Sequence, residues 1–349
     1  MNHLVIIAGG VGSRFWPMST PERPKQFIDV LGTGKTLLQL TAERFASICP
    51  MENVWVVTSV RYRELVKQQL PELPDSNILL EPCMRNTAPC IAYVAWKIKK
   101  QDPDACLVVS PSDHIVLNVA EFQRVVAKGM QFVAADERIL TLGMMPTRPE
   151  TGYGYIQMKA NTTAYQEEIH EVEAFKEKPD LSTAQSYLQS GDYLWNAGIF
   201  LWNVHTVEKA YRIFLPDVAA LFDSMDDIFF SVREQEEIDR RFPECRSISI
   251  DYAIMEHARN IYVFPASFGW SDLGTWGSLY GHVAKDDAQN AVIGDNVRMI
   301  ESTGCIVHVP AGRRMVLQGL EDYIVAEENG VLLVCRKSDE QRIKEFSQR

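Results

Sequence analysis

The sequence lacks the signatures of several protein classes. It contains no apolar run long enough to span a membrane, and its N-terminal apolar run is too short and wrongly flanked for a secretory signal. It also lacks an excess of positive charge, since the net charge of −11 argues against a broad surface for nucleic acid or anionic lipid. We therefore expect a cytoplasmic protein that holds any anionic ligand in a local basic cluster.

Patterns for zinc binding and disulfide bonding are absent as well. The seven cysteines are scattered without a C-x-x-C pair, and the seven histidines show no paired ligand spacing. We expect reduced thiols, and His114 is the histidine that stands beside a candidate site. If a metal takes part, a hard cation bound by oxygen atoms is the expected kind.

What the sequence does contain is a glycine loop typical of phosphate binding, directly after its first apolar run. The loop comprises Ala8, Gly9, Gly10, Gly12, Ser13 and Arg14. Glycines let backbone N–H groups approach phosphate oxygens, and Arg14 together with Lys25 adds two positive charges. A nucleoside triphosphate is the expected ligand, and a flexible loop that binds nothing is the alternative if this pattern stood alone.

Two commoner phosphate motifs fail on spacing. The dinucleotide fingerprint requires a third glycine where Phe15 stands, and Pro17 and Pro21 interrupt the helix that would follow. The segment 32–36 resembles the tail of a Walker A motif, but Asp29 occupies the place of its first glycine. We interpret that segment as a turn before a helix.

Alternating strand and helix patterns over the first 145 residues predict an α/β fold with a doubly wound, largely parallel sheet. We expect strands near 3–8, 53–58, 77–80, 105–109 and 139–143, and helices near 36–47, 60–69, 87–100 and 119–134. Because parallel strands end at one edge of a sheet, the glycine loop, the pair Glu81-Pro82 and the segment 110–114 are expected to gather there, where one pocket could hold them.

The rest of the chain departs from this alternation. The middle third predicts an antiparallel or mixed extension of the sheet, with helices over 204–243. From about residue 290, short β-branched runs predict a small all-β appendage that ends in a charged helix at 338–346. Because this segment carries no catalytic-looking group of residues, we expect its removal to affect solubility or assembly rather than chemistry.

Five motifs, in their order along nearly the whole chain, resemble those of the sugar-nucleotide pyrophosphorylases, and among these the bacterial mannose-1-phosphate guanylyltransferases. The motifs are the glycine loop with Trp16-Pro17 and Lys25, Glu81-Pro82 with 85–89, the segment 175–179, the segment 195–198 and the segment 269–276. Phe15 and Met18 stand where leucines are usual, and the isomerase domain of the longer relatives is not found.

The resemblance implies a Rossmann-like nucleotidyltransferase core with a mixed sheet over residues 1–288, and a small left-handed β-helix over 289–349 that mediates a homodimer. The implied reaction transfers GMP from GTP to α-mannose 1-phosphate, with release of pyrophosphate and with Mg²⁺ as cofactor. Positioning and charge neutralisation, without a protein nucleophile, suit this chemistry.

The same resemblance implies the site residues. The residues implied for nucleotide binding are Ala8, Gly9, Gly10, Gly12, Ser13, Arg14, Lys25, Glu81, Pro82, Asn86, Thr87, Ser110 and Asp113. The sugar phosphate falls to Gly154, Glu177, Lys178 and Asn196, and the metal to Asp113 and Asp272. The expected catalytic groups are Arg14, Lys25, Asp113, Lys178 and Asp272. Two carboxylates from distant loops form a minimal ligand set for Mg²⁺, which leaves positions for phosphates and water.

Several alternatives stay open. Lys178 precedes Pro179 and is expected in extended backbone, where it could form a salt bridge with Glu177 instead, and Asn196 could cap a turn. Another nucleotide or hexose 1-phosphate would suit similar machinery, although Glu81 and the carbonyls beside it could accept the two donors of guanine. A catalytically inactive nucleotide-sugar sensor is the alternative from another class, but a sensor has no need of the whole set of charged residues.

Overall fold

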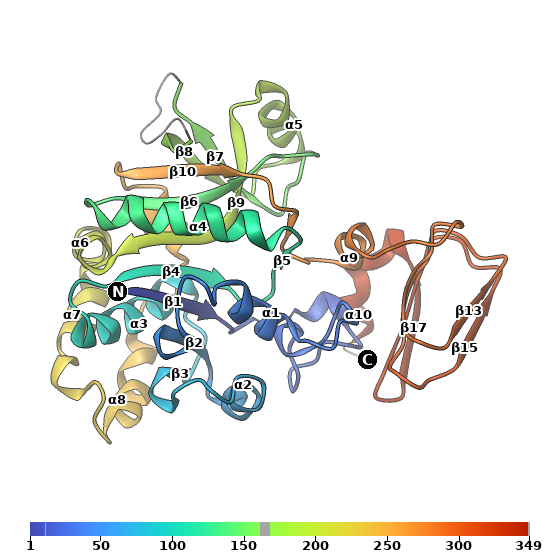
Figure 1. Ribbon diagram of the computed structural model, residues 1–349, viewed down its shortest axis with the longest axis horizontal. Coiled ribbons are helices and arrows are strands. Elements are labelled where there is room, and N and C mark those ends of the chain that lie inside the picture. The colour runs from blue at the N-terminus through green and yellow to red at the C-terminus, as the bar shows by residue number, and fades with distance from the viewer. Residues whose placement is uncertain (11, 161–167, 348–349) are drawn as a thin grey trace. The chain divides into compact units, whose positions relative to one another are not determined.

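The computed structural model describes residues 1–10, 12–160 and 168–347, so Val11 of the glycine loop lies outside the described residues. The chain divides into two compact units (Figure 1). The first unit consists of Met1–Gly9, Ala42–Ser112 and Val116–Trp270, and the second of Gly10–Thr41, Asp113–Ile115 and Ser271–Arg349.

The first unit is built on one mixed β-sheet. Its strands are β1 (Asn2–Ile7), β2 (Val54–Ser59), β3 (Ile78–Glu81), β4 (Cys106–Pro111), β6 (Ile139–Met144), β7 (Gly154–Met158), β8 (His170–Glu177), β9 (Tyr193–Asn203) and β10 (Ile261–Ala266). Within the described residues they run in the order β3-β2-β1-β4-β9-β6-β10-β8-β7. The first four are parallel, whereas β9 is antiparallel to both of its neighbours β4 and β6. The predicted α/β fold with a mixed sheet and an antiparallel extension is confirmed.

Helices cover both faces of this sheet. They are α2 (Arg63–Gln69), α3 (Thr87–Gln101), α4 (Val119–Ala134), α5 (Leu181–Ser190), α6 (Val204–Phe214), α7 (Pro216–Asp223) and α8 (Glu234–Arg241). The helix α3 packs with α6 and α7 over the face that Val5 and Val57 present (Figure 1). The helix α4 covers the other face, where a Cβ on Gly129 would lie 2.8 Å from Leu140 and 2.9 Å from Leu201. Because both faces are covered, the sequences of the central strands are continuous apolar runs.

The second unit contains the C-terminal strands. Its helices and strands include β12 (Ala291–Ile293), β13 (Val297–Ile300), β14 (Ile306–His308), β15 (Met315–Gln318), β16 (Tyr323–Glu328), β17 (Val331–Arg336), α9 (Trp276–His282) and α10 (Ile343–Phe346). Three short elements, α1 (Leu37–Arg44), β5 (Ile115–Val116) and β11 (Trp270–Ser271), span the unit boundaries. The strands β12, β14 and β16 pair in parallel, β13 and β15 form a second parallel pair, and β17 runs antiparallel to β16.

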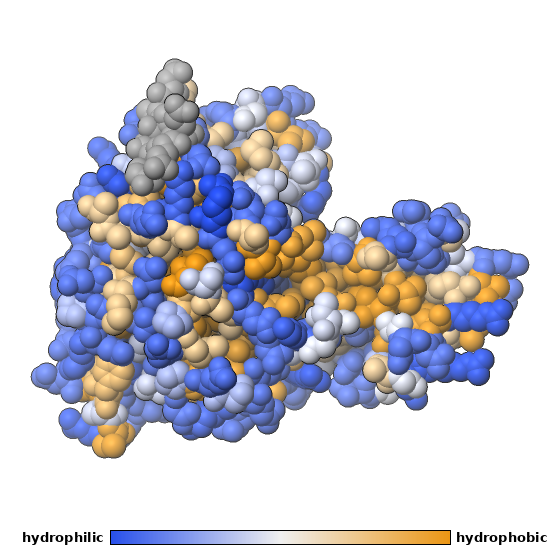
Figure 2. All heavy atoms as spheres, in the orientation of Figure 1, coloured by the Kyte–Doolittle hydropathy of each residue, from blue (hydrophilic) through white to orange (hydrophobic). Residues whose placement is uncertain are grey.

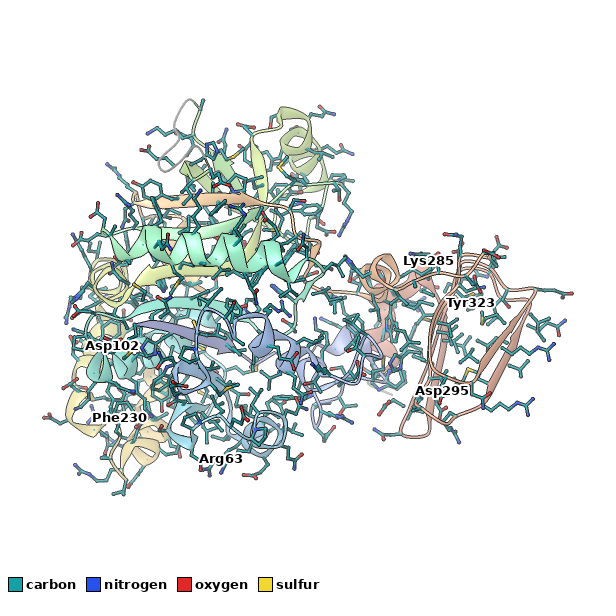
Figure 3. All side chains as sticks on the ribbon, in the orientation of Figure 1. Arg63, Asp102, Phe230, Lys285, Asp295 and Tyr323 are labelled. Carbon is teal, nitrogen blue, oxygen red and sulfur yellow. The ribbon has the colours of Figure 1, made fainter. Side chains whose placement is uncertain are left out.

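Side chains from both C-terminal sheets fill the space between them (Figure 3). Cys305, Val307 and Val325 are buried there, and Val297 and Met315 of the other pair pack against them. The predicted all-β appendage is confirmed. The predicted charged helix is a 3-10 helix, Lys337–Arg342, that continues into α10.

A second core in this unit joins the region after the glycine loop to the C-terminal segment. Phe15 and Met18 lie in it together with Trp276, Ile306 and Ile343. The rings of Phe15 and Trp276 are 5.4 Å apart between centroids. The chain that follows Gly10 is therefore held by residues from the far end of the sequence.

Three further properties bear on the expectations from composition. All seven cysteines are free thiols, as predicted. In the part of the chain that the structure describes, no helix combines the length and the apolar character that crossing a bilayer requires. Apolar side chains gather on the C-terminal strands (Figure 2), where Val316, Leu332 and Val334 are 51%, 56% and 47% exposed.

Candidate active site

The second unit contains a pocket at the glycine loop, which we call the phosphate pocket. Its volume is about 320 Å³. It is lined by Gly12, Ser13, Arg14, Phe15, Lys25, Asp113, His114, Asp272, Leu273, Gly274 and Lys344. Every site residue predicted in this unit except Gly10 is among them. Lys344, from the C-terminal helix, is a lining residue that the sequence motifs did not indicate.

Lys25 contacts the two other loops that line this pocket. Its Nζ atom lies 2.8 Å from Asp113 Oδ2 and donates hydrogen bonds to the backbone carbonyls of Asp272, at 3.0 Å, and Leu273, at 2.9 Å. Gly12 packs against it with φ +68°, and a Cβ there would lie 2.7 Å from the Lys25 Cβ. The position requires glycine for both reasons. The Lys25 charge is thus engaged by protein groups, and its predicted contact with nucleotide phosphates stays a prediction.

The two predicted metal ligands line the same pocket. The side chain of Asp113 is 33% exposed. Burial alone would raise the pKa of Asp113, but the charges of Lys25 and His114 and the hydrogen bond from Lys25 outweigh it, so this pKa is lowered. Asp113 is therefore a carboxylate at neutral pH. Asp272 Oδ1 accepts a hydrogen bond from Gly274 N at 3.0 Å, which orients its carboxylate within the loop.

This donor set suits a magnesium ion. Among the described residues, no group of three or more histidine, cysteine or acidic side chains is placed to hold a metal. A cation with two carboxylate ligands would need substrate or water oxygens for its other positions, and Mg²⁺ is usually bound in that way. Asp113 and Asp272 therefore fit the ion that the family resemblance implies.

Arg14 differs from Lys25 in its surroundings. It is exposed, on the 3-10 helix Ser13–Phe15. Within the described part of the chain its guanidinium makes no hydrogen bond or ion pair that ties up its charge. The pocket therefore combines one buried lysine engaged by the protein with one arginine available to an anion.

In the first unit, the parallel strands bring further predicted residues to one edge of the sheet. Ala8 follows β1 and is fixed by its N–H bond to Val57 O at 2.8 Å, and its carbonyl accepts a bond from the Thr58 hydroxyl at 2.7 Å. Gly9 faces the end of β3, where a Cβ on Gly9 would lie 3.8 Å from Glu81 Oε2. Ser110, at the end of β4, is buried. Its hydroxyl donates to Pro111 O at 3.1 Å.

Glu81 is the unusual group at this edge. Its Oε1 atom is buried and has no hydrogen-bond partner in the described residues. Burial raises the pKa of Glu81 to about 8, against a smaller opposing effect of its hydrogen bond with Cys90. An unsatisfied buried carboxyl oxygen is costly for stability, and it is the feature expected where a ligand donor completes the hydrogen bonding.

The polar atoms of the segment after Glu81-Pro82 form hydrogen bonds within the protein. Asn86, with φ +67°, caps α3 through Oδ1, which accepts a hydrogen bond from Thr87 N. The Thr87 hydroxyl accepts a hydrogen bond from Ile250 N at 2.9 Å. These contacts fix the start of α3, and a role of Asn86 and Thr87 in nucleotide binding stays a prediction.

The residues predicted for the sugar phosphate also meet in the first unit, on β7, β8 and β9. Gly154 pairs with Glu177 in register. A Cβ on Gly154 would overlap the Glu177 carboxylate and lie 3.3 Å from the Asn196 Cβ. Lys178 forms an ion pair with Glu177. All four predicted residues are thus neighbours, and Gly154 is needed for the close approach of the other two strands.

Of the two local alternatives for these residues, the salt bridge occurs, because Lys178 pairs with Glu177. Asn196 caps no turn, since it lies within the strand β9, where its Oδ1 accepts a hydrogen bond from Gly198 N at 3.0 Å. Burial would lower the pKa of Lys178, but its hydrogen bond to Glu177 and the nearby negative charges raise it overall. The ammonium is therefore charged and held beside the Glu177 carboxylate.

The expected extended backbone at Lys178 is wrong. Its φ is +46°, in the left-handed region, although Pro179 follows. The chain must turn within a few residues between the end of β8 and α5, where Asp180 caps the helix through Thr183 N. A hydrogen bond from Lys178 N to Tyr153 O at 3.2 Å holds this turn, so tertiary contacts override the local preference before proline.

Asp251 is a polar residue of this group that the sequence motifs missed. It lies on the π-helix Asp251–Met255 and accepts a hydrogen bond from Asn196 Nδ2 at 3.0 Å. Burial, together with the charge of Glu177, raises the pKa of Asp251 to about 6. Because its partner is 55 positions away, no local spacing signals the contact.

Comparisons with known proteins agree with the fold. A family model described as nucleotidyl transferase matches residues 3–289. The chain is 34% identical to the mannose-1-phosphate guanylyltransferase of Escherichia coli, over 99% of this chain and 74% of that protein. It is 37% identical to the xanthan biosynthesis protein XanB of Xanthomonas campestris pv. campestris strain B100, over 98% of this chain and 71% of that protein.

A solved structure gives a similar result. The crystal structure described as mannose-1-phosphate geranyltransferase from Thermus thermophilus superposes with a TM-score of 0.89 at 29% identity, and covers 100% of this chain and 98% of that one. The chain therefore belongs to the nucleotidyl transferase family. It is an enzyme of the nucleotidyltransferase class, as the five motifs predicted.

Proposed function

We propose that this enzyme transfers GMP from GTP to α-D-mannose 1-phosphate, which gives GDP-mannose and pyrophosphate. The observation that carries the proposal is the phosphate pocket, where Arg14 and Lys25 lie together with Asp113 and Asp272. The relatives at 34–36% identity whose names include mannose-1-phosphate guanylyltransferase support the choice of sugar and nucleotide.

The phosphate pocket binds the triphosphate in this proposal. Arg14 neutralises phosphate oxygens directly, and the backbone at Gly12 and Ser13 approaches them closely. Lys25 orients Asp113 and the loop of Asp272 through its ion pair and its two carbonyl contacts. Beside Gly9, Glu81 in its ionised form accepts the N1–H and the amine of guanine, which pairs its buried Oε1.

The second substrate binds at the group on β7, β8 and β9. The carboxylate of Glu177 and the amide of Asn196 have the acceptors and donors that sugar hydroxyls need, and Gly154 leaves room for their approach. Lys178 exchanges its contact with Glu177 for the phosphate of mannose 1-phosphate. Its raised pKa keeps it cationic for that purpose.

The chemistry needs no protein nucleophile. A phosphate oxygen of mannose 1-phosphate attacks the α-phosphorus of GTP in line, and the bond from that phosphorus to the oxygen bridging the α- and β-phosphates breaks. The protein positions the reactants and neutralises charge, with Arg14 facing the pyrophosphate that leaves. Asp113 and Asp272 would hold a magnesium ion, which when bound supplies positive charge to the phosphate oxygens.

We also propose a cytoplasmic homodimer. Residues 289–349 form a domain in which the parallel strands wind as a left-handed β-helix, and residues 1–288 form the catalytic domain. The exposed apolar side chains of Val316, Leu332 and Val334 support assembly through the C-terminal strands.

A pyrophosphate-release assay tests the reaction. The full chain is incubated with Mg²⁺ and each pair from a panel of nucleoside triphosphates and hexose 1-phosphates, with Asp272→Asn as the matched control. Release with GTP and mannose 1-phosphate in preference to all other pairs is expected. Preference for another pair would reassign the substrates, and nucleotide-sugar binding without release from any pair would favour the sensor.

A further inference from the structure

The C-terminal helix α10 (Ile343–Phe346) reaches the phosphate pocket. Lys344 lines this pocket together with Arg14 and Lys25. The preceding residue, Ile343, is fully buried in the core that contains Phe15 and Trp276. Because Ile343 anchors α10 in the same core as Phe15, the position of Lys344 relative to the glycine loop is fixed by packing within one unit.

The charges of the pocket indicate a role for this lysine. Arg14 and Lys25 carry two positive charges, and Asp113 and Asp272 carry two negative ones, so these four side chains cancel. Lys25 is moreover engaged by Asp113 and by two backbone carbonyls. Lys344 makes the sum of these side-chain charges positive, which favours binding of a triphosphate.

The Lys344 side chain has no competing partner in the described part of the chain. It is exposed, and its ammonium makes no hydrogen bond or ion pair there. Arg342, two residues earlier, differs in this respect, since its guanidinium lies 3.4 Å from Glu345 and does not line the pocket. Both residues carry one positive charge, but only Lys344 lines the pocket, so variants of the two compare the effect of position at equal charge.

We propose that Lys344 binds the terminal phosphates of the nucleoside triphosphate, and equally the pyrophosphate of the reverse reaction. The assignment rests on the proposed function for the identity of the ligand. It gives the C-terminal segment a direct part in substrate binding. The segment is then more than a support for the fold or an interface.

The test uses the full-length variants Lys344→Ala, Lys344→Arg and Arg342→Ala in steady-state assays of both directions. Loss of a charge-assisted hydrogen bond predicts that Lys344→Ala raises the KM for GTP and for pyrophosphate about tenfold. The KM for mannose 1-phosphate should stay within about twofold in that variant, since no phosphate of the sugar contacts Lys344. Lys344→Arg should restore most of the affinity, and Arg342→Ala should behave as the unmodified chain.

Two results would overturn the proposal. One is an active enzyme in which Lys344→Ala leaves both KM values unchanged. The other is an equal rise in Lys344→Ala and Arg342→Ala, because that would mean a general effect of net charge. If the unmodified chain releases no pyrophosphate from GTP, the proposed function fails. Calorimetric titration with inorganic pyrophosphate, compared between the unmodified chain and Lys344→Ala, then decides on Lys344 separately.

Discussion

Replacement of Glu81 by glutamine is expected to stabilise the folded protein near neutral pH. The pKa of this carboxyl is about 8 in the folded chain, against an ordinary value of 4.5. Between these values the unfolded chain is ionised while the folded chain retains the proton. Stability is therefore lost as the pH rises from 4.5 towards 8, by about 1.4 kcal/mol per pH unit.

Glutamine has a similar shape and does not titrate, so the free energy of unfolding of the variant lacks this decrease with pH. The stabilisation by Glu81→Gln should be about 3 kcal/mol larger at about pH 7.5 than at about pH 5. Urea denaturation of both proteins at both pH values measures the difference, with the exposed Glu72→Gln as the matched control. An equal effect of Glu81→Gln at the two pH values would refute the reasoning from burial.

The same change should weaken guanine binding. Because the proposed contact needs ionised Glu81, the affinity of the unmodified chain for GTP should rise nearly tenfold per pH unit below about pH 8 and level off above it. Glu81→Gln should lose this dependence and bind GTP more weakly, while its affinity for UTP changes little. Equilibrium titration with the two nucleotides across this range measures both effects, and a flat profile for GTP in the unmodified chain would contradict the contact.

Three further predictions concern the other groups. Asp272→Asn should lower kcat by about a hundredfold or more without a change in the urea midpoint, since Lys25 keeps its bond to the backbone of that residue; near-normal turnover would count against the metal assignment. Lys178→Ala should raise the KM for mannose 1-phosphate about tenfold and leave that for GTP unchanged, because the lost charge faces the sugar phosphate; equal changes would place Lys178 with the nucleotide. Leu332→Lys should convert a dimer into a monomer in sedimentation, and unchanged assembly would show that β17 is no interface.

Local patterns in the sequence predict much of this fold. The apolar run at Val54–Ser59 forms β2, and the glycine-rich segment 32–36 is a turn in which Asp29 accepts bonds from Thr33 N and Gly34 N. These features depend on residues within a few positions of one another. The composition of the glycine loop likewise indicated Gly12, Ser13 and Arg14, which line the phosphate pocket.

Features that depend on distant residues escaped prediction. Asp251 joins the group at Asn196 through a contact across the fold, and Lys344 reaches the pocket because Ile343 is buried in a core that it shares with Phe15. Lys178 adopts a backbone angle that its following proline disfavours, because Tyr153 holds the turn. In each case the deciding partner is not a sequence neighbour, so no periodicity or spacing carries the signal.

The contacts of Lys25 have a consequence for the synthesis of the protein. Its carbonyl partners, Asp272 and Leu273, lie 247 and 248 positions later in the chain. A nascent chain on the ribosome therefore contains the glycine loop and Lys25 long before the residues that contact Lys25 have been made. Until translation has passed Leu273, Lys25 lacks these two hydrogen bonds and stays solvated. The backbone contacts that orient Lys25 in the phosphate pocket therefore form only after Leu273 has been made.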